Sequence, residues 1–392
     1  MRLAVLTTHP IQYNAPLFRE LAHRPGLDLH VFYGWEGTAN YTDVEFGRRI
    51  AWDIPLLDGY KWTLTPNIAN DPGTHHFDGI DNPEMNKQIA AWRPDAILVY
   101  GWAWRTHLRA MREFKGHVPI LFRGDSTLMS SRTTLLKRML RRPALIWVYR
   151  HIDIALSPGR HNRAYFRAMG VPDNRIRWVP HAIDRDRFDP NDAGARAIAH
   201  RIRQEAGIRD GETTFVFAGK LVPRKEVDTL IAAFRKLTDR SHQARLLVVG
   251  DGPERPRLEA LAAGMSAISF IGFHNQSDMP GVYLAGDVLV LPSRFETWGL
   301  ALNEALSLGR LAIASDRVGA SADLLEGKAY GRIFPCGDVE ALAMAMATFV
   351  PASEHIGPLG DAARADSINW SIPAAADAIQ ASLAEIVGVA AC

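Results

Sequence analysis

The 392-residue sequence predicts an α/β protein with two Rossmann-like domains in tandem, each a doubly wound parallel sheet. A chain of this length is too long for one ordinary core and comfortable for two domains. Runs of consecutive apolar residues are typical of strands that are buried on both faces of a parallel sheet. Stretches with helical spacing separate these runs, so helices are expected to connect the strands.

The second half of the chain alternates most regularly between these two patterns. "TFVFAGKL" is a β-branched and aromatic run, and "VDTLIAAFRKL" after it has the spacing of an amphipathic helix. The expected strands are residues 213–221, 244–252, 268–274, 287–293 and 311–316, and the expected helices are residues 227–237, 254–264, 278–286 and 299–309. We assign residues 213–367 to a C-terminal domain.

The first half shows a looser version of the same alternation. Its expected strands are residues 3–9, 27–34, 95–101, 118–125, 153–159 and 175–181. We assign residues 1–184 to an N-terminal domain and the polar stretch 185–212, which has no strand signal, to a connector. The tail, about residues 368–392, has a helical pattern and is expected to pack back on the N-terminal domain. Residues 35–82 are irregular, with weak strand signals only.

The composition is that of a soluble globular protein, with 47% hydrophobic and 22% charged residues. The formal net charge of +2 gives no reason to expect a nucleic-acid partner. Two cysteines, Cys336 and Cys392, are too few for a disulfide framework, which suits a reducing cytoplasm. We find no secretory h-region and no run of about 18 apolar residues, so we expect a cytoplasmic protein without a membrane span.

The stretch "ETWGLALNE" places two carboxylates, Glu296 and Glu304, across a strand-to-helix turn. Ligands of an open α/β sheet bind at the carboxyl ends of the strands, and Glu296 lies just past such an end. The helix that opens near Gly299 has unpaired N–H groups and a partial positive charge at its start, which suit a phosphate. Glu304 lies roughly 7–8 Å into the helix, so it can contact another part of the same ligand. The alternative is a charged helix start followed by a solvated glutamate.

Two lysines form the next candidate group. Lys220 and Lys225 flank a proline-containing loop after the expected strand 213–221. Lysine is a strongly hydrated point charge that suits phosphate. The ends of neighbouring strands converge in a doubly wound sheet, so these cations are expected to meet the loop at residues 296–299. A solvent-exposed charged turn is the alternative, and the glycine turn "VVGDGPE" is only a weak third signal.

The ordered motifs "GKLVPRKEVDTL", "LLVVGDGPERPRLE", "ISFIGF", "VYLAGDVLVLPSRFETWGLALNEALSLG" and "GRIFPCGDVEAL" resemble the GT-B-fold retaining glycosyltransferases of family 4. The resemblance covers nearly all of residues 213–345, and the spacing of Glu296 and Glu304 is the hallmark of that family. It implies two domains facing a cleft, with a nucleotide-sugar donor held mainly by the second domain. A weaker resemblance covers "SPGRHNRAYFRAMGVPDNRIRWVPHAIDRDRF" in the first half.

The resemblance also implies roles for single residues. Glu304 would bond the ribose hydroxyls, and Glu296 would face the hydroxyls of the donor sugar. Lys220 and Lys225 would bind the diphosphate, and the backbone amides around residues 295–299 would line the sugar and the diphosphate. The expected donor-binding residues, with Phe273 and His274 beside the base, are Gly219, Lys220, Lys225, Phe273, His274, Thr297, Trp298, Gly299, Leu300 and Glu304.

Several positions depart from the pattern of that family. Lys220 stands where Arg is usual, so a bidentate contact with phosphate is lost and a point charge remains. Glu226 stands where Gly is usual, and the loop "THPIQYNAP" after the first strand contains no Gly at all. "VGASADLLEG" lacks the usual second Gly, and "PHAID" replaces the usual Pro-Asn-Gly-Val-Asp. These departures leave the identities of the sugar and of the acceptor open.

Two residues of the first half join Glu296 as catalytic candidates. His9 follows the first strand, where it can touch the acceptor or the donor phosphate, and a turn histidine before Pro10 is the alternative. Asp125, in "FRGDS", follows another strand, near the place where the family often has a His-Asp pair. Asp125 can contact an acceptor hydroxyl or act as a base, or it can cap a helix that starts near Thr127.

The segment "LLKRMLRR", residues 135–142, has a basic amphipathic pattern. Its basic residues share one helical face and its apolar residues lie opposite; they are Lys137, Arg138, Arg141 and Arg142, and Leu135, Leu136, Met139 and Leu140. One interpretation is a solvated face over a core face. The other is peripheral contact with an anionic membrane, at about 1 kcal/mol per basic residue, which would suit a lipid-linked acceptor.

We therefore expect a retaining glycosyltransferase that uses a UDP- or GDP-sugar and a sugar, lipid-linked or small-molecule acceptor, in cell-surface polysaccharide, glycolipid or glycoconjugate biosynthesis. We expect no metal and no other cofactor, because no Asp-x-Asp pair follows a cleft-facing strand and Lys220 and Lys225 can balance the leaving diphosphate. The mechanism favoured for the family is a front-face substitution in which the departing phosphate takes the acceptor's proton. A nucleotide-sugar epimerase of the same fold and an acceptor-free sugar-nucleotide-binding protein are the alternatives.

Overall fold

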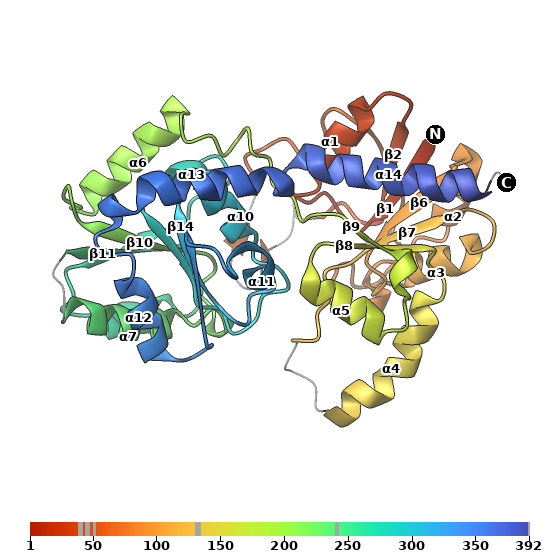
Figure 1. Cartoon of the computed structure of the whole chain (residues 1–392). Helices are drawn as coiled ribbons and strands as arrows, with labels where there is room; N and C mark the ends of the chain where they lie inside the picture. The colour runs from red at the N-terminus through yellow and green to blue at the C-terminus, as the bar shows by residue number, and fades with distance from the viewer. Residues whose placement is uncertain (38–41, 44–47, 50–51, 130–134, 240–242, 391–392) are drawn as a thin grey trace. The chain divides into compact units, whose positions relative to one another are not determined.

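The computed structural model describes residues 1–37, 42–43, 48–49, 52–129, 135–239 and 243–390, which form two compact units (Figure 1). Unit 1 comprises Met1–Tyr41, Pro55–Ala182 and Ile372–Cys392, and unit 2 comprises Thr42–Ile54 and Ile183–Ser371. Across the described ranges, no helix has both the length and the apolar character that crossing a membrane requires.

Unit 1 contains a seven-stranded parallel sheet with the strand order β5-β2-β1-β6-β7-β8-β9. Its strands are β1 (Arg2–Thr7), β2 (Asp28–Tyr33), β5 (Lys61–Leu64), β6 (Ala96–Tyr100), β7 (Ile120–Arg123), β8 (Ile154–Ser157) and β9 (Ile176–Trp178). Its helices are α1 (Ala15–His23), α2 (Met85–Trp92), α3 (Arg105–Phe114), α4 (Leu135–Tyr149), α5 (Arg160–Ala168) and α14 (Ile372–Ala390), with 3-10 turns η2 (Phe77–Gly79) and η3 (Asp173–Arg175). The direction in which strands are added reverses between β1 and β6.

Alternate residues of the interior strands enter two separate cores of unit 1, one on each face of the sheet. In β1, Leu3 and Val5 pack in the core that α1 and α14 cover. Ala4 and Leu6 pack in the core that α2, α3 and α5 cover. Because successive side chains point to opposite faces, burial of both faces requires the continuous apolar runs seen in the sequence.

Helix α14, at the end of the chain, belongs to unit 1 and lies beside α1 near the start of the chain (Figure 1). Its apolar face is buried against the core that contains Leu3 and Val5, through Ala375, Ala376, Ile379 and Leu383. An ion pair connects Glu385 of α14 with Arg177, the middle residue of β9. The last helix is therefore an integral part of the first sheet's covering layer.

Unit 2 contains a six-stranded parallel sheet with the order β12-β11-β10-β13-β14-β15 over a single hydrophobic core. Its strands are β10 (Thr213–Ala218), β11 (Ala244–Val249), β12 (Ile268–Gly272), β13 (Val288–Leu291), β14 (Leu311–Ser315) and β15 (Gly331–Phe334), with a separate pair, β3 (Thr42–Asp43) and β4 (Arg48–Arg49). Its helices are α6 (Ala193–Glu205), α7 (Val227–Thr238), α8 (Arg255–Leu261), α9 (Met279–Leu284), α10 (Leu300–Ser307), α11 (Ser321–Leu324), α12 (Val339–Ala347) and α13 (Ile356–Ser367). Its 3-10 turns are η4 (Pro223–Lys225), η5 (Ala352–Glu354) and η6 (Ile368–Trp370).

The predicted fold class of two doubly wound parallel sheets is confirmed, and each strand expected from an apolar run is present. The prediction missed the edge strands β5 and β15, because their sequences, KWTL and GRIF, are short and contain no continuous apolar run. The stretch 185–212, predicted as a connector, is part of unit 2 and contains α6. Residues 42–54 also belong to unit 2, where Asp53 accepts a hydrogen bond from the backbone of Ser277.

Burial of α14 gives a direct test of its contribution to unit 1. Leu383→Ala removes a side chain that is 1% exposed, so the free energy of unfolding should fall by about 2–5 kcal/mol. Leu140→Ala is the matched control, because Leu140 on α4 is 71% exposed and its loss should change stability by less than about 0.5 kcal/mol. Denaturant titration of the three proteins measures both effects, and an unchanged midpoint for Leu383→Ala would show that α14 is dispensable.

Candidate functional site

The carboxyl ends of β10 and β13 lie side by side at the point where the strand order of unit 2 reverses. The loops that leave two such strands go to opposite faces of the sheet, so this point is where open α/β sheets bind ligands. In unit 2 the two loops are residues 219–226, after β10, and residues 292–299, after β13. A backbone hydrogen bond of 2.8 Å from Arg294 N to Arg224 O joins them.

An ion pair between Lys225 and Glu296 connects these two loops. The side chains are only 13% and 14% exposed, so each charge depends on the other for compensation. Ser293 Oγ donates to Glu296 Oε1 at 2.9 Å, and Arg224 Nη1 lies 4.0 Å from Glu296 Oε2. The structure thus brings together Lys225 and Glu296, which the sequence analysis placed on converging loops.

Glycines, which lack a Cβ, allow neighbouring loops to approach one another closely. A side chain at Gly219 would start 3.7 Å from Lys225 Nζ, so Gly219 leaves the lysine head group uncovered on that side. Gly250, in the motif "VVGDGPE", has φ +130°, and a Cβ there would collide with the carbonyl oxygen of Gly219. Contact between the backbones of Gly250 and Gly219 therefore explains the need for glycine in the turn after β11.

Helix α10 begins at the same edge of the sheet. Gly299 precedes it with φ +103° and has no side chain with which to cap the first turn. The N–H groups at the start of the helix and the helix dipole can therefore act on a ligand. Thr297 and Leu300 are half-buried beside it, whereas Trp298 is 4% exposed and belongs to the core, where its Nε1 donates to Asn303 Oδ1 at 2.8 Å. The side chain of Trp298 is therefore not part of the site.

Glu304 is a buried carboxylate on α10, with 3% of its surface exposed. Its Oε2 accepts a 2.7 Å hydrogen bond from the hydroxyl of Tyr283 on α9. Its Oε1 is buried and has no hydrogen-bond partner among the described residues. Burial raises the pKa of Glu304 to about 7, although the Tyr283 hydrogen bond and the charge of Arg187 oppose this shift. The alternative of a solvated helix position does not apply.

Arg187 is the basic residue that faces Glu304, and the sequence analysis missed it. Its guanidinium lies over the ring of Phe188, 4.7 Å from the centroid, and its Nη1 donates to Gln276 Oε1 at 3.1 Å. Its Nε is buried and, within the described ranges, has no hydrogen-bond partner. A buried donor and a buried acceptor without partners in one neighbourhood favour a ligand that supplies both.

The other expected donor-binding residues follow strands at the same edge of unit 2. Lys220 follows β10 and is half-buried. Phe273 and His274 follow β12 and are also half-buried, and His274 Nδ1 lies 3.1 Å from Asp278 Oδ2. The strands β10 and β12 lie on either side of β11 in one parallel sheet, so these residues follow strand ends at one edge, and their roles stay predictions.

His9 belongs to unit 1, where it follows β1 at the point where that strand order also reverses. Its Nδ1 lies 2.9 Å from Thr8 Oγ1, and its ring meets the edge of Trp35 at a centroid distance of 5.4 Å. Burial lowers the pKa of His9 to about 4. The imidazole is therefore neutral near neutral pH, so His9 suits a hydrogen bond with a hydroxyl better than compensation of a phosphate charge.

Asp125 is exposed after β7 of unit 1. The interpretation of Asp125 as an N-cap is wrong, because residues 124–129 contain no helix and the next described helix begins at Leu135. Its neighbour Arg123 turns inward and donates to the carbonyl oxygens of Val179 and Pro180. Asp125 is therefore free of a capping role, and its part in catalysis stays a prediction.

The basic segment 135–142 forms the first half of α4. The side chains of residues 135–139 lie outside the described set, which leaves Leu140, Arg141 and Arg142 to compare with the prediction. Leu140 is exposed like the two arginines, so the interpretation as a core face does not hold at this residue. Ile146 and Trp147, further along α4, are also exposed.

Two family models match the chain. Residues 199–365 match the family described as Glycosyl transferases group 1, and residues 17–187 match Glycosyltransferase Family 4. The first match contains the ion pair of Lys225 and Glu296 and the buried Glu304, and the second begins within α1 and ends at Arg187.

Curated relatives and solved structures are similar to this chain over different lengths. The sulfoquinovosyl transferase SQD2 of Arabidopsis thaliana is 27% identical over 76% of this chain and 58% of its own length. A GDP-mannose-dependent alpha-(1-6)-phosphatidylinositol monomannoside mannosyltransferase of Mycolicibacterium smegmatis is 28% identical over 58% of this chain and 61% of its own length. The chain thus matches about six tenths of these relatives.

The structure of HepE from Anabaena in complex with UDP and glucose superposes with a TM-score of 0.73 at 16% identity, covering 98% of this chain and 100% of HepE. At this identity the likeness concerns the fold alone. The predicted GT-B architecture of two Rossmann-like units is confirmed.

The buried charge of Glu304 should make the stability of unit 2 depend on pH. Because the pKa rises from 4.5 to about 7 on folding, ionisation of Glu304 opposes folding progressively as the pH increases through this window. Glu304→Gln removes that cost, so its stability advantage over the wild type should grow by about 2–3 kcal/mol between about pH 5 and pH 8. Denaturant unfolding followed by tryptophan fluorescence measures this difference, and an advantage that is constant with pH would contradict it.

Proposed function

This chain belongs to the group 1 and family 4 glycosyltransferases, and from that premise we propose that it transfers a sugar from a nucleotide-sugar donor to an acceptor hydroxyl. The observation that carries the proposal is the edge of unit 2 at β10 and β13, where a lysine, two glutamates and a helix start gather. The names of the relatives, sulfoquinovosyl and mannosyl transferases, support the same reaction class.

The diphosphate of the donor binds to Lys225, Lys220 and the first amides of α10. In the ligand-free chain the ammonium of Lys225 is paired with Glu296. A diphosphate carries more charge than a carboxylate, so it competes for this lysine. Donor binding then releases Glu296 to face the hydroxyls of the sugar. UDP and GDP remain the candidate nucleotides, since one relative is named for GDP-mannose and one similar structure contains UDP.

The ribose binds between Glu304 and Arg187. A pair of neighbouring hydroxyls offers both a donor and an acceptor, which are the groups that Glu304 Oε1 and Arg187 Nε lack. Each buried atom gains a partner on binding, so the interaction is strong relative to the ligand-free state. The positive charge of Arg187 also favours the ionised form of Glu304.

We further propose that transfer proceeds with retention, by substitution on the face from which the diphosphate leaves. The bond between the anomeric carbon and the phosphate oxygen breaks, the acceptor oxygen bonds to the same face, and the departing phosphate takes the acceptor's proton. Lys225 and Lys220 stabilise the negative charge of the leaving group, and Glu296 stabilises the positive charge that develops on the sugar. The reaction as proposed uses no metal and no other cofactor.

In the proposed reaction, residues of unit 1 bind the acceptor. His9 and Asp125 follow strands of that unit and can bind the acceptor hydroxyl, His9 as a neutral imidazole and Asp125 as an exposed carboxylate. A sugar, a lipid-linked glycan or a small molecule would satisfy such groups. The proposed setting is the synthesis of cell-surface polysaccharide, glycolipid or glycoconjugate at the cytoplasmic side of a membrane.

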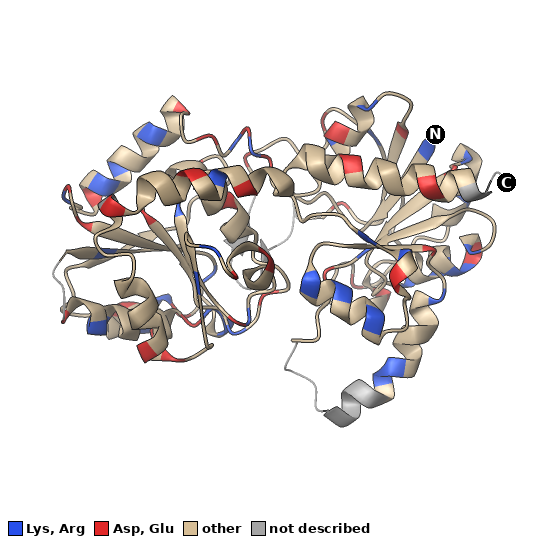
Figure 2. Cartoon of the chain, in the orientation of Figure 1, with Lys and Arg blue, Asp and Glu red and all other residues tan. Residues whose placement is uncertain are grey.

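Helices α4 and α5 support peripheral contact with an anionic membrane. Figure 2 shows Lys and Arg along α5 and along the described part of α4. The two helices are neighbours, because Arg142 Nε on α4 donates to the carbonyl oxygen of Ala168 at the end of α5. Exposed Leu140 and Trp147 on α4 add apolar side chains to this basic surface, as membrane-surface helices do.

Neutralising Glu296 should mainly lower the turnover rate, and neutralising Glu304 should mainly weaken nucleotide binding. Glu296→Gln should lower kcat about 10- to 1000-fold, because it removes charge from the reacting sugar, while UDP or GDP binds at least as tightly as before because Lys225 is released. Glu304→Gln should weaken nucleotide binding about 10- to 100-fold, since a charged hydrogen bond to a hydroxyl is worth about 1.5–3 kcal/mol. Glu205→Gln, on the exposed end of α6, is the control.

Steady-state kinetics and calorimetry with UDP and GDP measure these effects in parallel, after a screen of UDP- and GDP-sugars with and without acceptor extracts. Loss of nucleotide binding in Glu296→Gln with full turnover would mean that the two roles are exchanged. Conversion of the donor without any acceptor would favour an epimerase, and binding without conversion would favour an acceptor-free binding protein.

Membrane contact can be tested separately from catalysis. Replacement of Lys137, Arg138, Arg141 and Arg142 by Gln should weaken binding to anionic vesicles at least about 100-fold, at about 1 kcal/mol per charge. Activity on a soluble acceptor should remain. Arg201→Gln on α6 and zwitterionic vesicles are the controls, and failure of the wild type to sediment with anionic vesicles at low salt ends the proposal.

A further inference from the structure

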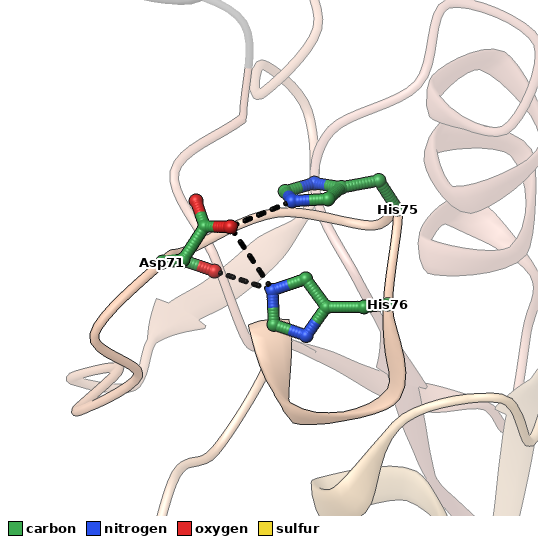
Figure 3. A group of neighbouring side chains, drawn as sticks. All are labelled: Asp71, His75 and His76. Carbon is green, nitrogen blue, oxygen red and sulfur yellow. Dashed lines mark hydrogen bonds and ion pairs between the residues drawn. The ribbon is translucent and has the colours of Figure 1, made fainter.

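A loop of unit 1 between β5 and α2 brings two histidines and an aspartate together, as Figure 3 shows for Asp71, His75 and His76. His75 Nε2 lies 2.9 Å from Asp71 Oδ2, and His76 Nε2 lies 3.4 Å from the same oxygen. His76 Nε2 also lies 2.9 Å from the carbonyl oxygen of Asp71. Both imidazole rings thus turn the same nitrogen toward one carboxylate.

These separations suit a single metal ion. Zn²⁺ binds imidazole nitrogen and carboxylate oxygen at about 2.0–2.2 Å, so two of its ligand atoms lie roughly 3–3.5 Å apart. The two distances from Asp71 Oδ2 are of this size, and the three candidate ligand atoms all lie within 4.8 Å of one another. Small rotations of exposed side chains would complete the coordination.

Hydrogen bonds of residues other than the three candidate ligands also hold this loop in place. Gly73 N donates to Gly79 O at 3.0 Å, and the side chain of Asn67 donates to the same carbonyl at 2.9 Å. A Cβ at Gly73 would lie 2.6 Å from His75 Nδ1, so only glycine leaves room for the observed position of that ring. The loop is therefore closed and the ligand atoms are already gathered, which lowers the cost of ordering them on binding.

The neighbouring carboxylates of the loop are engaged elsewhere. Asp78 pairs with Arg105 of α3, and Asp81 pairs with Arg109 of α3 at 2.7 Å. Asp71 instead faces the two histidines. The charge that would attract a cation is thus concentrated at the histidine pair.

We propose that Asp71, His75 and His76 form a binding site for one divalent transition-metal ion of the zinc class. Two imidazoles and one carboxylate suit Zn²⁺, Ni²⁺ or Cu²⁺, whereas Mg²⁺ and Ca²⁺ prefer oxygen ligands alone. Metal binding replaces the hydrogen bonds at Nε2 by coordination. Three protein ligands leave a position for water or for an oxygen of a bound molecule.

The site shares no residue with the proposed transfer reaction, which uses Lys220, Lys225, Glu296 and Glu304 of unit 2 and His9 and Asp125 of unit 1. It lies after β5, at the carboxyl edge of the sheet to which His9 also belongs. The alternative is a loop in which His75 and His76 serve only as hydrogen-bond donors to Asp71. The two cases differ in whether metal binds, and a binding measurement separates them.

The test is calorimetric titration of the full chain, free of any affinity tag and treated with chelator, with ZnCl₂. We expect one Zn²⁺ per chain, and at least about tenfold weaker binding for His75→Ala and for His76→Ala. His117→Ala removes another exposed histidine of unit 1 and should bind as the wild type does. Titration of the wild type with Co²⁺ should give the visible absorption of a four-coordinate site, which needs no variant to fold.

Two results would overturn the proposal. One is the lack of Zn²⁺ binding and of a Co²⁺ spectrum in the wild type at metal concentrations far above that of the protein. The other is undiminished binding after replacement of Asp71, His75 and His76 together, which would place the metal elsewhere on the chain. Circular dichroism of the variants confirms that weaker binding reflects lost ligands rather than lost structure.

Discussion

The reversal of strand order between β10 and β13 is the constraint on which the site of unit 2 depends. Both strands are interior and fully buried, so their carboxyl ends are fixed by the sheet rather than by the loops. The loops that follow lead to helices on opposite faces of the sheet, and residues 224–225 of one meet residues 294–296 of the other at this edge. Lys225 and Glu296 meet there as a partly buried pair, and Gly250 permits the close approach of its backbone to that of Gly219. The buried strands β10 and β13 thus determine where the charged residues of the site lie.

Several groups at this edge destabilise the ligand-free chain. Glu304 and Arg187 each bury a polar atom without a hydrogen-bond partner among the described residues, and burial raises the pKa of Glu304. Glu226, where the family usually has Gly, adopts φ +53° and is held there by Arg294 and Thr229. Such local costs are expected where residues serve a ligand rather than the fold, and the apolar core beneath them offsets the loss.

The strands and the order in which they follow one another could be predicted from local patterns in the sequence. Strands buried on both faces are continuous apolar runs, and residues that follow adjacent strands must converge, so the meeting of Lys225 and Glu296 followed from topology alone. Arg187 was missed because it comes from a polar stretch whose packing against α10 is set by long-range contacts. The core position of the Trp298 side chain could not be predicted, because the motif indicates the course of the backbone but not the direction of that side chain. The group at Asp71 lies in an irregular loop, where no periodicity indicates which side chains meet.

The residues that follow the strand-order reversal are charged in unit 2, whereas a neutral histidine follows it in unit 1. In unit 2 the strand-order reversal carries Lys225, Glu296 and, further along α10, Glu304, so that edge can respond to a highly charged ligand. In unit 1 the corresponding position after β1 carries His9, which burial keeps neutral near neutral pH. A neutral imidazole can orient a hydroxyl without attracting a second phosphate. In the proposed reaction, the strand-order reversal of unit 2 would stabilise the charge of the donor, and that of unit 1 would orient the neutral hydroxyl of the acceptor.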